Sequence, residues 1–209
     1  MLAYHSLLDA MTITTFPALL ASAVFLARLL PQPVRTLRTG QVTGVSVLAA
    51  MNACIADIAW LVYGLTSRVV TIWLVCIPAI AASAGTVWVL RRLIARRDLV
   101  ASAIWLAAVG LAAWSGALTF VLAGTVLVSC GPSLWSAFRS DRPVGIAPGT
   151  WLIALADAAT WGLYGLAISN LALELYAVVL LATAVAILSR LRWTSSLVDN
   201  LPPTSVISG

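Results

Sequence analysis

Charged residues are scarce in this sequence, and lysine is absent from it. Only 9% of the 209 residues are charged, whereas 62% are hydrophobic. Soluble domains carry about 25% charged and about 45–50% apolar residues, and a water-soluble globule of this size has too little interior to hide the excess. In a bilayer, every face of a helix is free to be apolar. The composition therefore excludes an ordinary soluble domain and predicts an all-helical membrane protein.

Cysteine and histidine are too sparse to build a disulfide framework or a metal centre. The three cysteines lie inside apolar segments and form no Cys-x-x-Cys pair, and His5 has no Cys or His neighbour. Such cysteines behave as small apolar residues. The sequence also shows no nucleophile–base pair, metal-ligand cluster or phosphate-binding loop. We therefore expect no metal, no cofactor and no enzymatic activity.

Long apolar runs follow one another along the chain with short connections between them. A helix needs about 20 apolar residues to cross the hydrocarbon core, and the pattern predicts seven transmembrane helices. They are Ile13–Leu30, Val45–Leu65, Val69–Leu90, Leu99–Ser115, Ala117–Phe138, Ile146–Ile168 and Leu171–Leu191. The turn at Ser115, Gly116 and Ala117 must be tight, because the fourth span ends at Ser115 and the fifth begins at Ala117. The alternative is to fuse these two, which gives six spans.

The basic residues are all arginines, and they gather in the connections between the spans. Clusters occur at 28–38, 91–97, 139–142 and 190–192, and seven spans place all of them on one side, with only Arg68 on the other. Positive residues collect on the cytoplasmic side. We therefore expect a multi-pass cell-membrane protein with its N-terminus outside and its C-terminus in the cytoplasm. A net charge of +5 arranged in this way is a topology signal and not a nucleic-acid groove.

The second half of the chain repeats the first at an offset of 101 positions. The shift aligns Pro31, Arg38, Gly44, Trp60, Tyr63 and Gly64 with Pro132, Arg139, Gly145, Trp161, Tyr164 and Gly165. Apolar runs align easily by chance, whereas proline, glycine, tryptophan and tyrosine at one fixed offset do not. Each copy holds three spans, so one span between them returns both copies to the same orientation.

The repeat predicts a fold of two parallel three-helix repeats joined by a linker helix, a 3+1+3 plan. The predicted parts are 1–92 for the first repeat, 93–116 for the linker helix, 117–193 for the second repeat and 194–209 for a disordered cytoplasmic tail. Secondary transporters use this plan, with the substrate site near the midplane between the two copies.

The motifs in each copy resemble a known superfamily. Pro31-Gln32, then Thr43-Gly44-Val45-Ser46 and Trp60-x-x-Tyr63-Gly64, are similar to the PQ-loop (MtN3/saliva) superfamily. Within it, the doubled Trp-x-x-Tyr-Gly and the 3+1+3 plan most resemble the SWEET sugar transporters, over nearly the whole chain. The resemblance implies passive, alternating-access transport of a small sugar, with Trp60 and Trp161 lining the sugar pocket.

The sequence departs from that family at two pocket positions. The family uses an Asn in the third and in the seventh span to hydrogen-bond the sugar, and this chain has Ala79 and Leu180 there. Sugar hydroxyls need donors and acceptors, because an unpaired polar group in a dry site costs about 1–3 kcal/mol. The resemblance therefore implies the fold more firmly than it implies the sugar.

Two tryptophans and two acids inside the spans are the candidate substrate-binding residues. Asp57 and Asp157 lie near the centres of their spans, where a carboxylate costs about 2.5–3.5 kcal/mol. Each shares a helix face with a tryptophan, because Asp57 is three residues before Trp60 and Asp157 four before Trp161. Asn52 is expected to join the same cavity. The alternatives are structural carboxyl groups bonded between helices and an interfacial belt for the tryptophans.

Three prolines near span ends are candidate hinges. Pro31 and Pro132 fall near the cytoplasmic ends of the first and fifth spans, and Pro148 near the start of the sixth. Proline removes a backbone hydrogen bond and kinks a helix. The simpler interpretation is that each marks the end of a helix.

The leading functional prediction is facilitative transport of a small sugar by alternating access. One alternative is proton-coupled transport of an amino acid or related metabolite, which the paired aspartates and the missing asparagines favour. Another is a receptor or assembly factor that binds a ligand without moving it, because a fold does not determine a function. The expected partners are the lipid bilayer and a small solute, with homo-oligomers left open.

Overall fold

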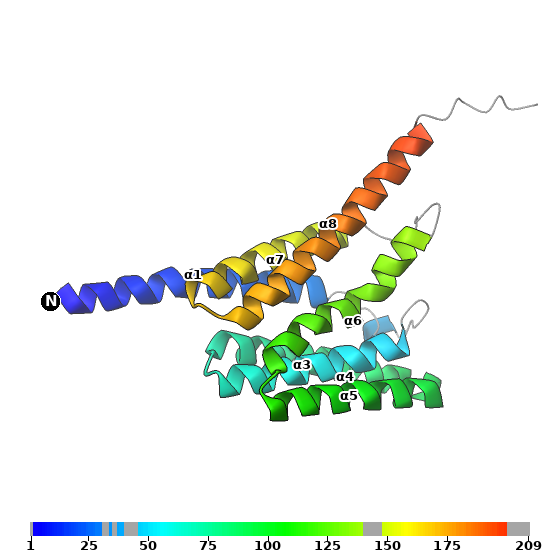
Figure 1. Cartoon of the computed structure of the whole chain (residues 1–209), viewed down its shortest axis with the longest axis horizontal. Helices are drawn as coiled ribbons and strands as arrows, with labels where there is room; N and C mark the ends of the chain where they lie inside the picture. Colours follow the sequence, from blue (N-terminus) through cyan, green and yellow to red (C-terminus); the bar gives the residue numbers. More distant parts are fainter. Residues whose placement is uncertain (1, 31–33, 35–36, 40–45, 140–147, 200–209) are drawn as a thin grey trace, which may run out of the picture.

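The computed structural model describes residues 2–30, 34, 37–39, 46–139 and 148–199, and within these ranges it contains helices and no strand. The long helices are α1 (Leu2–Leu29), α3 (Val47–Thr66), α4 (Val70–Leu90), α5 (Arg96–Ser115), α6 (Leu118–Arg139), α7 (Pro148–Ala167) and α8 (Leu171–Asp199). A short 3-10 helix, η1 (Arg91–Leu93), follows α4. The prediction of an all-helical protein is confirmed, and each predicted span overlaps one of these helices (Figure 1).

Four segments are long and apolar enough to cross a membrane within the described residues. They are Val47–Thr66, Val70–Leu93, Arg96–Ser115 and Leu171–Trp193, while Phe16–Leu29 and Leu118–Gly131 are shorter apolar stretches. The predicted span at Ile146–Ile168 is not among them. Its helix, α7, buries Asp157, two tryptophans and Tyr164 against its neighbours. Protein therefore covers much of the surface of α7, whereas a lipid-facing helix surface needs apolar side chains.

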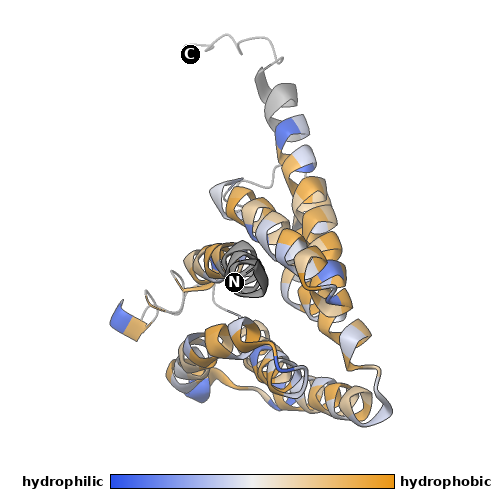
Figure 2. Cartoon of the chain, turned by 90° about the vertical axis from the view of Figure 1, so that its left-hand side faces the viewer, coloured by the Kyte–Doolittle hydropathy of each residue, from blue (hydrophilic) through white to orange (hydrophobic). Residues whose placement is uncertain are grey.

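The surface of the helices has the apolar character that lipid requires. Large apolar side chains are exposed along α5 in particular, where Trp114 is 86% exposed and Ile104, Leu106 and Leu111 are also exposed. Figure 2 shows apolar residues covering much of the visible helix surface. Exposed apolar patches of this extent fit a membrane environment and not water.

Two helix boundaries follow directly from local sequence. The hydroxyl of Ser46 accepts a hydrogen bond from Ala49 N at 3.2 Å and so caps the N-terminus of α3. Gly116 ends α5 with φ at +79°, a left-handed conformation that glycine adopts without strain, and α6 begins two residues later. The predicted tight turn after Ser115 is therefore present.

The C-terminal boundary differs from the prediction. Helix α8 continues to Asp199, so residues 194–199 are helical where a disordered tail was predicted, and 200–209 lie outside the described residues. The helix runs on because its first strong breakers are Pro202 and Pro203, and proline disfavours helical conformation in the residue before it.

We call α1, α3 and α4 the first helix group and α6, α7 and α8 the second, following their order in the chain. In the first group α3 packs on α4 and α1 also contacts α4; in the second α7 packs on α8 and α6 contacts α8. Between the groups α1 packs on α7 and α6 packs on α3, while α5 lies against α3 and α6. The α3–α4, α5–α6 and α7–α8 turns lie at one end of the molecule, which we call the turn end (Figure 1).

The α3–α4 and α7–α8 turns have the same backbone structure at the 101-residue offset. Val69 N donates to Gly64 O at 2.9 Å, and Asn170 N donates to Gly165 O at 2.8 Å. Arg68 and Ser169, also 101 positions apart, both have positive φ, at 57° and 51°. The turns begin at glycines because there is no room for a side chain: a Cβ on Gly64 would lie 2.7 Å from Trp73 N.

Candidate functional site

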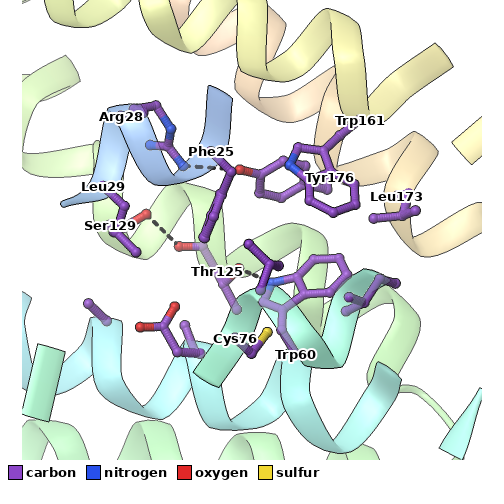
Figure 3. Close-up of a pocket in the computed structure, with 15 residues that line it drawn as sticks. Phe25, Arg28, Leu29, Trp60, Cys76, Thr125, Ser129, Trp161, Leu173 and Tyr176 are labelled. Atoms are coloured by element: carbon purple, nitrogen blue, oxygen red, sulfur yellow. Dashed lines mark hydrogen bonds between the residues drawn. The ribbon is translucent and has the colours of Figure 1, made fainter. Parts of the chain in front are cut away.

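A cavity of about 120 Å³ lies between the two helix groups. Its volume is well above the roughly 10–15 Å³ that one water molecule needs. Six helices contribute to its wall. Figure 3 shows the side chains that line it. The lining residues are Phe25, Arg28 and Leu29 of α1, Ala53, Ala56, Asp57 and Trp60 of α3, Ile72, Val75 and Cys76 of α4, Thr125 and Ser129 of α6, Trp161 of α7, and Leu173 and Tyr176 of α8.

Helix α3 presents one continuous face to the cavity. Ala53, Ala56, Asp57 and Trp60 follow the i, i+3, i+4, i+7 spacing of a single helix face. The prediction that Asn52 joins them is wrong. Its side-chain oxygen accepts a hydrogen bond from Ser102 of α5 at 3.2 Å, and it lies roughly 140° around the helix from Asp57. Asn52 therefore joins α3 to α5 outside the cavity.

The predicted tryptophans both line the cavity, and each contacts an aromatic residue from the opposite group. Trp60 packs edge-on against Tyr176, with ring centroids 5.5 Å apart. Trp161 packs edge-on against Phe25 at 6.4 Å. Trp60 also donates from Nε1 to Thr125 Oγ1 at 3.4 Å (Figure 3). Both indoles are therefore parts of the contact between the groups, and an interfacial belt does not describe them.

The two predicted aspartates have different environments. Asp157 is fully buried, and its Oδ2 accepts from Arg28 Nε at 2.8 Å and from Tyr176 OH at 2.9 Å. Arg28 Nη2 donates in turn to Tyr176 OH at 3.0 Å, a bond that Figure 3 shows. This bond closes a network of Arg28, Asp157 and Tyr176. Arg28 belongs to α1 and its partners belong to α7 and α8. The network therefore joins the two helix groups at the cavity wall.

Asp57 lies on the α3 side of the same cavity with a weaker set of partners. It is 7% exposed, and its Oδ2 accepts a hydrogen bond from Ser83 of α4 at 3.1 Å. No cation pairs with it in the part of the chain that the structure describes. The two carboxylates lie at similar points of their predicted spans, but Asp157 forms an ion pair and Asp57 makes a single hydroxyl contact.

Eight of the fifteen residues on the cavity wall correspond in pairs across the repeat. At an offset of 101, the lining residues form the pairs Arg28 and Ser129, Trp60 and Trp161, Ile72 and Leu173, and Val75 and Tyr176. The tryptophan pair and the aliphatic pair conserve their character. In the other two pairs, one member is ionic or phenolic and the other is small or apolar, so the polar chemistry of the wall is asymmetric.

Sequence reasoning missed Arg28 and Tyr176. Arg28 was assigned to the cluster of arginines that sets the topology, and the structure instead places it on the cavity wall. A signal was present, because Arg28 lies inside the predicted span Ile13–Leu30 and a charge within a span is expected to have an opposite charge near it. Nothing in the sequence distinguished Tyr176 from other apolar positions of its helix.

The remaining candidate residues lie away from the cavity wall or outside the described part of the chain. Pro31 falls outside the described residues, Pro132 lies within α6, and Pro148 is the first residue of α7. Proline is favoured at that first position because its missing N–H has no partner there in any case. Ala79 and Leu180, which replace the expected asparagines, are fully buried and do not line the cavity.

At the turn end, the two groups are joined by hydrogen bonds from corresponding tyrosines. Tyr63 OH donates to Asn170 Oδ1 at 3.1 Å, and Tyr164 OH and Thr71 Oγ1 lie 2.8 Å apart in a hydrogen bond. Each tyrosine thus reaches the start of the last helix of the other group. The pair closes this end of the contact between the groups.

Comparison with known proteins identifies a similar solved structure. The chain is similar to the structure of a eukaryotic SWEET transporter, with a TM-score of 0.67 over 88% of this chain and 98% of that chain, at 18% sequence identity. No family model matches the sequence, and no curated protein matches it. The fold that the sequence motifs implied is therefore confirmed as SWEET-like.

Proposed function

We propose that this chain is an alternating-access membrane transporter for a small polar solute, with a sugar as the leading candidate. The observation that carries the proposal is the cavity between the helix groups, lined by Trp60 and Trp161 from corresponding positions. In transporters with such a plan, the site lies between two similar helix groups. When one group rocks against the other, the site opens first to one side of the membrane and then to the other. The apolar helices and the SWEET-like fold support this function.

The same proposal assigns the helices to a 3+1+3 plan. The matching contacts of α1, α3 and α4 with those of α6, α7 and α8, and the matching turns, support two three-helix repeats with α5 as the linker. All three turns lie at one end of the molecule. The C-terminal ends of α4 and α6, near Arg91 and Arg139, lie at the other end. The positive-inside rule then puts the turn end outside and the C-terminus in the cytoplasm.

The described arrangement corresponds to a state closed on the outside. The tyrosine hydrogen bonds join the groups at the turn end, and the helices diverge toward the opposite end, where α8 runs away from α4 and α5 (Figure 1). Transport requires these bonds to break while the cytoplasmic ends approach. Pro31 and Pro132 remain the candidate hinges for that movement.

A sugar is the first candidate because the solved neighbour is a SWEET transporter and because two indoles flank the cavity. An indole stacks on the apolar face of a sugar ring. A proton-coupled transporter of an amino acid or related metabolite is the second candidate. The specific observation in its favour is the pair of buried carboxylates, Asp57 and Asp157, together with apolar residues at positions 79 and 180.

The test is uptake of radiolabelled glucose into liposomes that hold the purified chain, with and without an imposed proton gradient. We expect saturable uptake without a gradient, lost in Trp60→Ala. Trp114→Ala is the matched control, because Trp114 is exposed on α5 and lies outside the cavity.

Each outcome separates the candidates. Uptake that needs the gradient, or that occurs only for amino acids in the same assay, would select the second candidate. Binding without any solute crossing the bilayer would contradict transport altogether and leave a receptor that holds its ligand.

A further inference from the structure

The charges at the cavity do not balance. Among the described residues, Arg28 and Asp57 are the charged residues on its wall, and Asp157 lies off the wall, where it binds Arg28. When both carboxylates are ionised, one guanidinium against two carboxylates leaves one negative charge. Arg28 forms an ion pair with Asp157 at 2.8 Å and also donates a hydrogen bond to Tyr176. Asp57 is therefore the carboxylate that lacks a counter-ion.

Asp57 is placed to meet a ligand. It is 93% buried, by its exposure of 7%, and it lines the cavity from the face of α3 that also carries Trp60. One of its oxygens accepts from Ser83, and none of the described residues donates to the other. A buried carboxylate without a cation is costly, and either a bound proton or a positively charged partner from outside the protein relieves that cost.

The neighbouring side chains suit an organic cation better than a bare metal ion. Trp60 lies one helix turn from Asp57, and the face of an indole attracts an ammonium group. The rest of the α3 and α4 wall is Ala53, Ala56, Ile72, Val75 and Cys76, which offers no further oxygen ligands. A hard metal ion prefers six or more oxygens, whereas an ammonium needs a carboxylate and an aromatic face.

We propose that the solute carries one ammonium group, which binds between Asp57 and Trp60 and neutralises the cavity. This inference rests on the proposed transport function and names the class of its substrate. With a hydroxylated ring held at the indoles, the simplest such solute is an amino sugar. The hydroxyl groups of the sugar would then face Thr125 and Ser129, which lie on the cavity wall on α6 of the second helix group.

Three probes that differ in one group test the charge directly. Glucosamine, N-acetylglucosamine and glucose are titrated against the purified full chain at about pH 6.5, where an amine is protonated, and binding is followed by tryptophan fluorescence. We expect glucosamine to bind at least tenfold more tightly than the other two. In Asp57→Asn we expect the preference to fall to threefold or less.

Glu174→Gln is the matched control, because Glu174 is a carboxylate of α8 that does not line the cavity. It should keep the full preference. Thermal unfolding of each variant checks that it is folded. If Asp57→Asn does not fold, the relative binding of the three sugars to the unsubstituted chain tests the proposal.

Equal binding of the three sugars, which a proton resident on Asp57 would produce, would overturn the inference. A preference for glucose, or no binding of any of the three, would overturn it as well. Glucose uptake into liposomes is independent of this result, so saturable glucose uptake without a glucosamine preference would leave the proposed function standing and remove the ammonium site alone.

Discussion

The two helix groups share a backbone plan and differ in the chemistry that they bring to the cavity. Each has a tryptophan on the wall, a tyrosine at the turn end and a glycine at the turn, at matching positions. The carboxylate of the second group is bound in an ion pair, whereas that of the first contacts a hydroxyl. A duplicated scaffold therefore fixes the place of a site, and single side chains fix what it recognises.

The difference between the aspartates should have the largest effect on stability. Asp157→Asn leaves the Arg28 guanidinium without its counter-ion, and we expect the free energy of unfolding to fall by about 3 kcal/mol. This is the low end of the range for buried pairs, because the Arg28 side chain is 20% exposed. Asp57→Asn loses one hydroxyl contact and should cost about 1 kcal/mol or less. Unfolding of the purified variants in detergent measures both.

A second variant separates charge from shape at the same place. The double substitution Arg28→Met with Asp157→Leu removes both charges and should recover most of the lost stability, because apolar residues often replace a buried pair without loss. Equal destabilisation by Asp57→Asn and Asp157→Asn would contradict the asymmetry of the two groups.

The matching turns predict matching sensitivity to a methyl group. Gly64→Ala places its Cβ 2.7 Å from the backbone nitrogen of Trp73, which cannot move aside, and should cost about 1–3 kcal/mol. Gly165→Ala meets Leu173 Cβ at 2.9 Å and should cost a similar amount. Gly110→Ala is the control, since its Cβ would meet nothing within 4 Å, and in a helix it should stabilise by up to about 1 kcal/mol. Unfolding midpoints that fail to separate these variants would refute the close packing.

The smallest expected effect concerns the tyrosines that close the turn end. Tyr63→Phe and Tyr164→Phe each remove one hydrogen bond between the groups, worth about 0.5–1.5 kcal/mol. Each should shift the protein toward an outward-open state. The readout is labelling of the cavity thiol Cys76 by an impermeant reagent from outside, with Cys54 and Cys130 replaced by Ala. Unchanged labelling in both variants would show that these bonds do not hold that end closed.

Much of the fold could be predicted because its determinants are local. Hydropathy and length located each helix, and Gly116 marked the tight turn after α5. Two predictions from the local sequence differed from the structure. The apolar run at 146–168 predicts a transmembrane span, and α7 is not among the described segments that are long and apolar enough to cross a membrane. The end of α8 lies beyond the predicted boundary because no breaker precedes Pro202.

The candidate site was predicted in part. Trp60, Trp161 and Asp57 line the cavity as expected, and Asp157 reaches it through Arg28. Their helix spacing placed each acid and tryptophan on one face, and the repeat brought the two faces together. The prediction for Asn52 was wrong because its face of α3 packs against α5. The position of α5 is set by contacts that are not local in the sequence.

The sequence by itself determined the membrane environment, the helices, the internal repeat and some of the residues that line the shared cavity, because composition, periodicity and a fixed offset are properties of the chain. Only the tertiary structure decided which carboxylate has the cation. Arg28 is 129 positions from Asp157, and it meets that carboxylate because α1 packs on α7 across the two groups. A contact between distant helices depends on their packing, and packing is what leaves Asp57 facing the cavity without a paired cation.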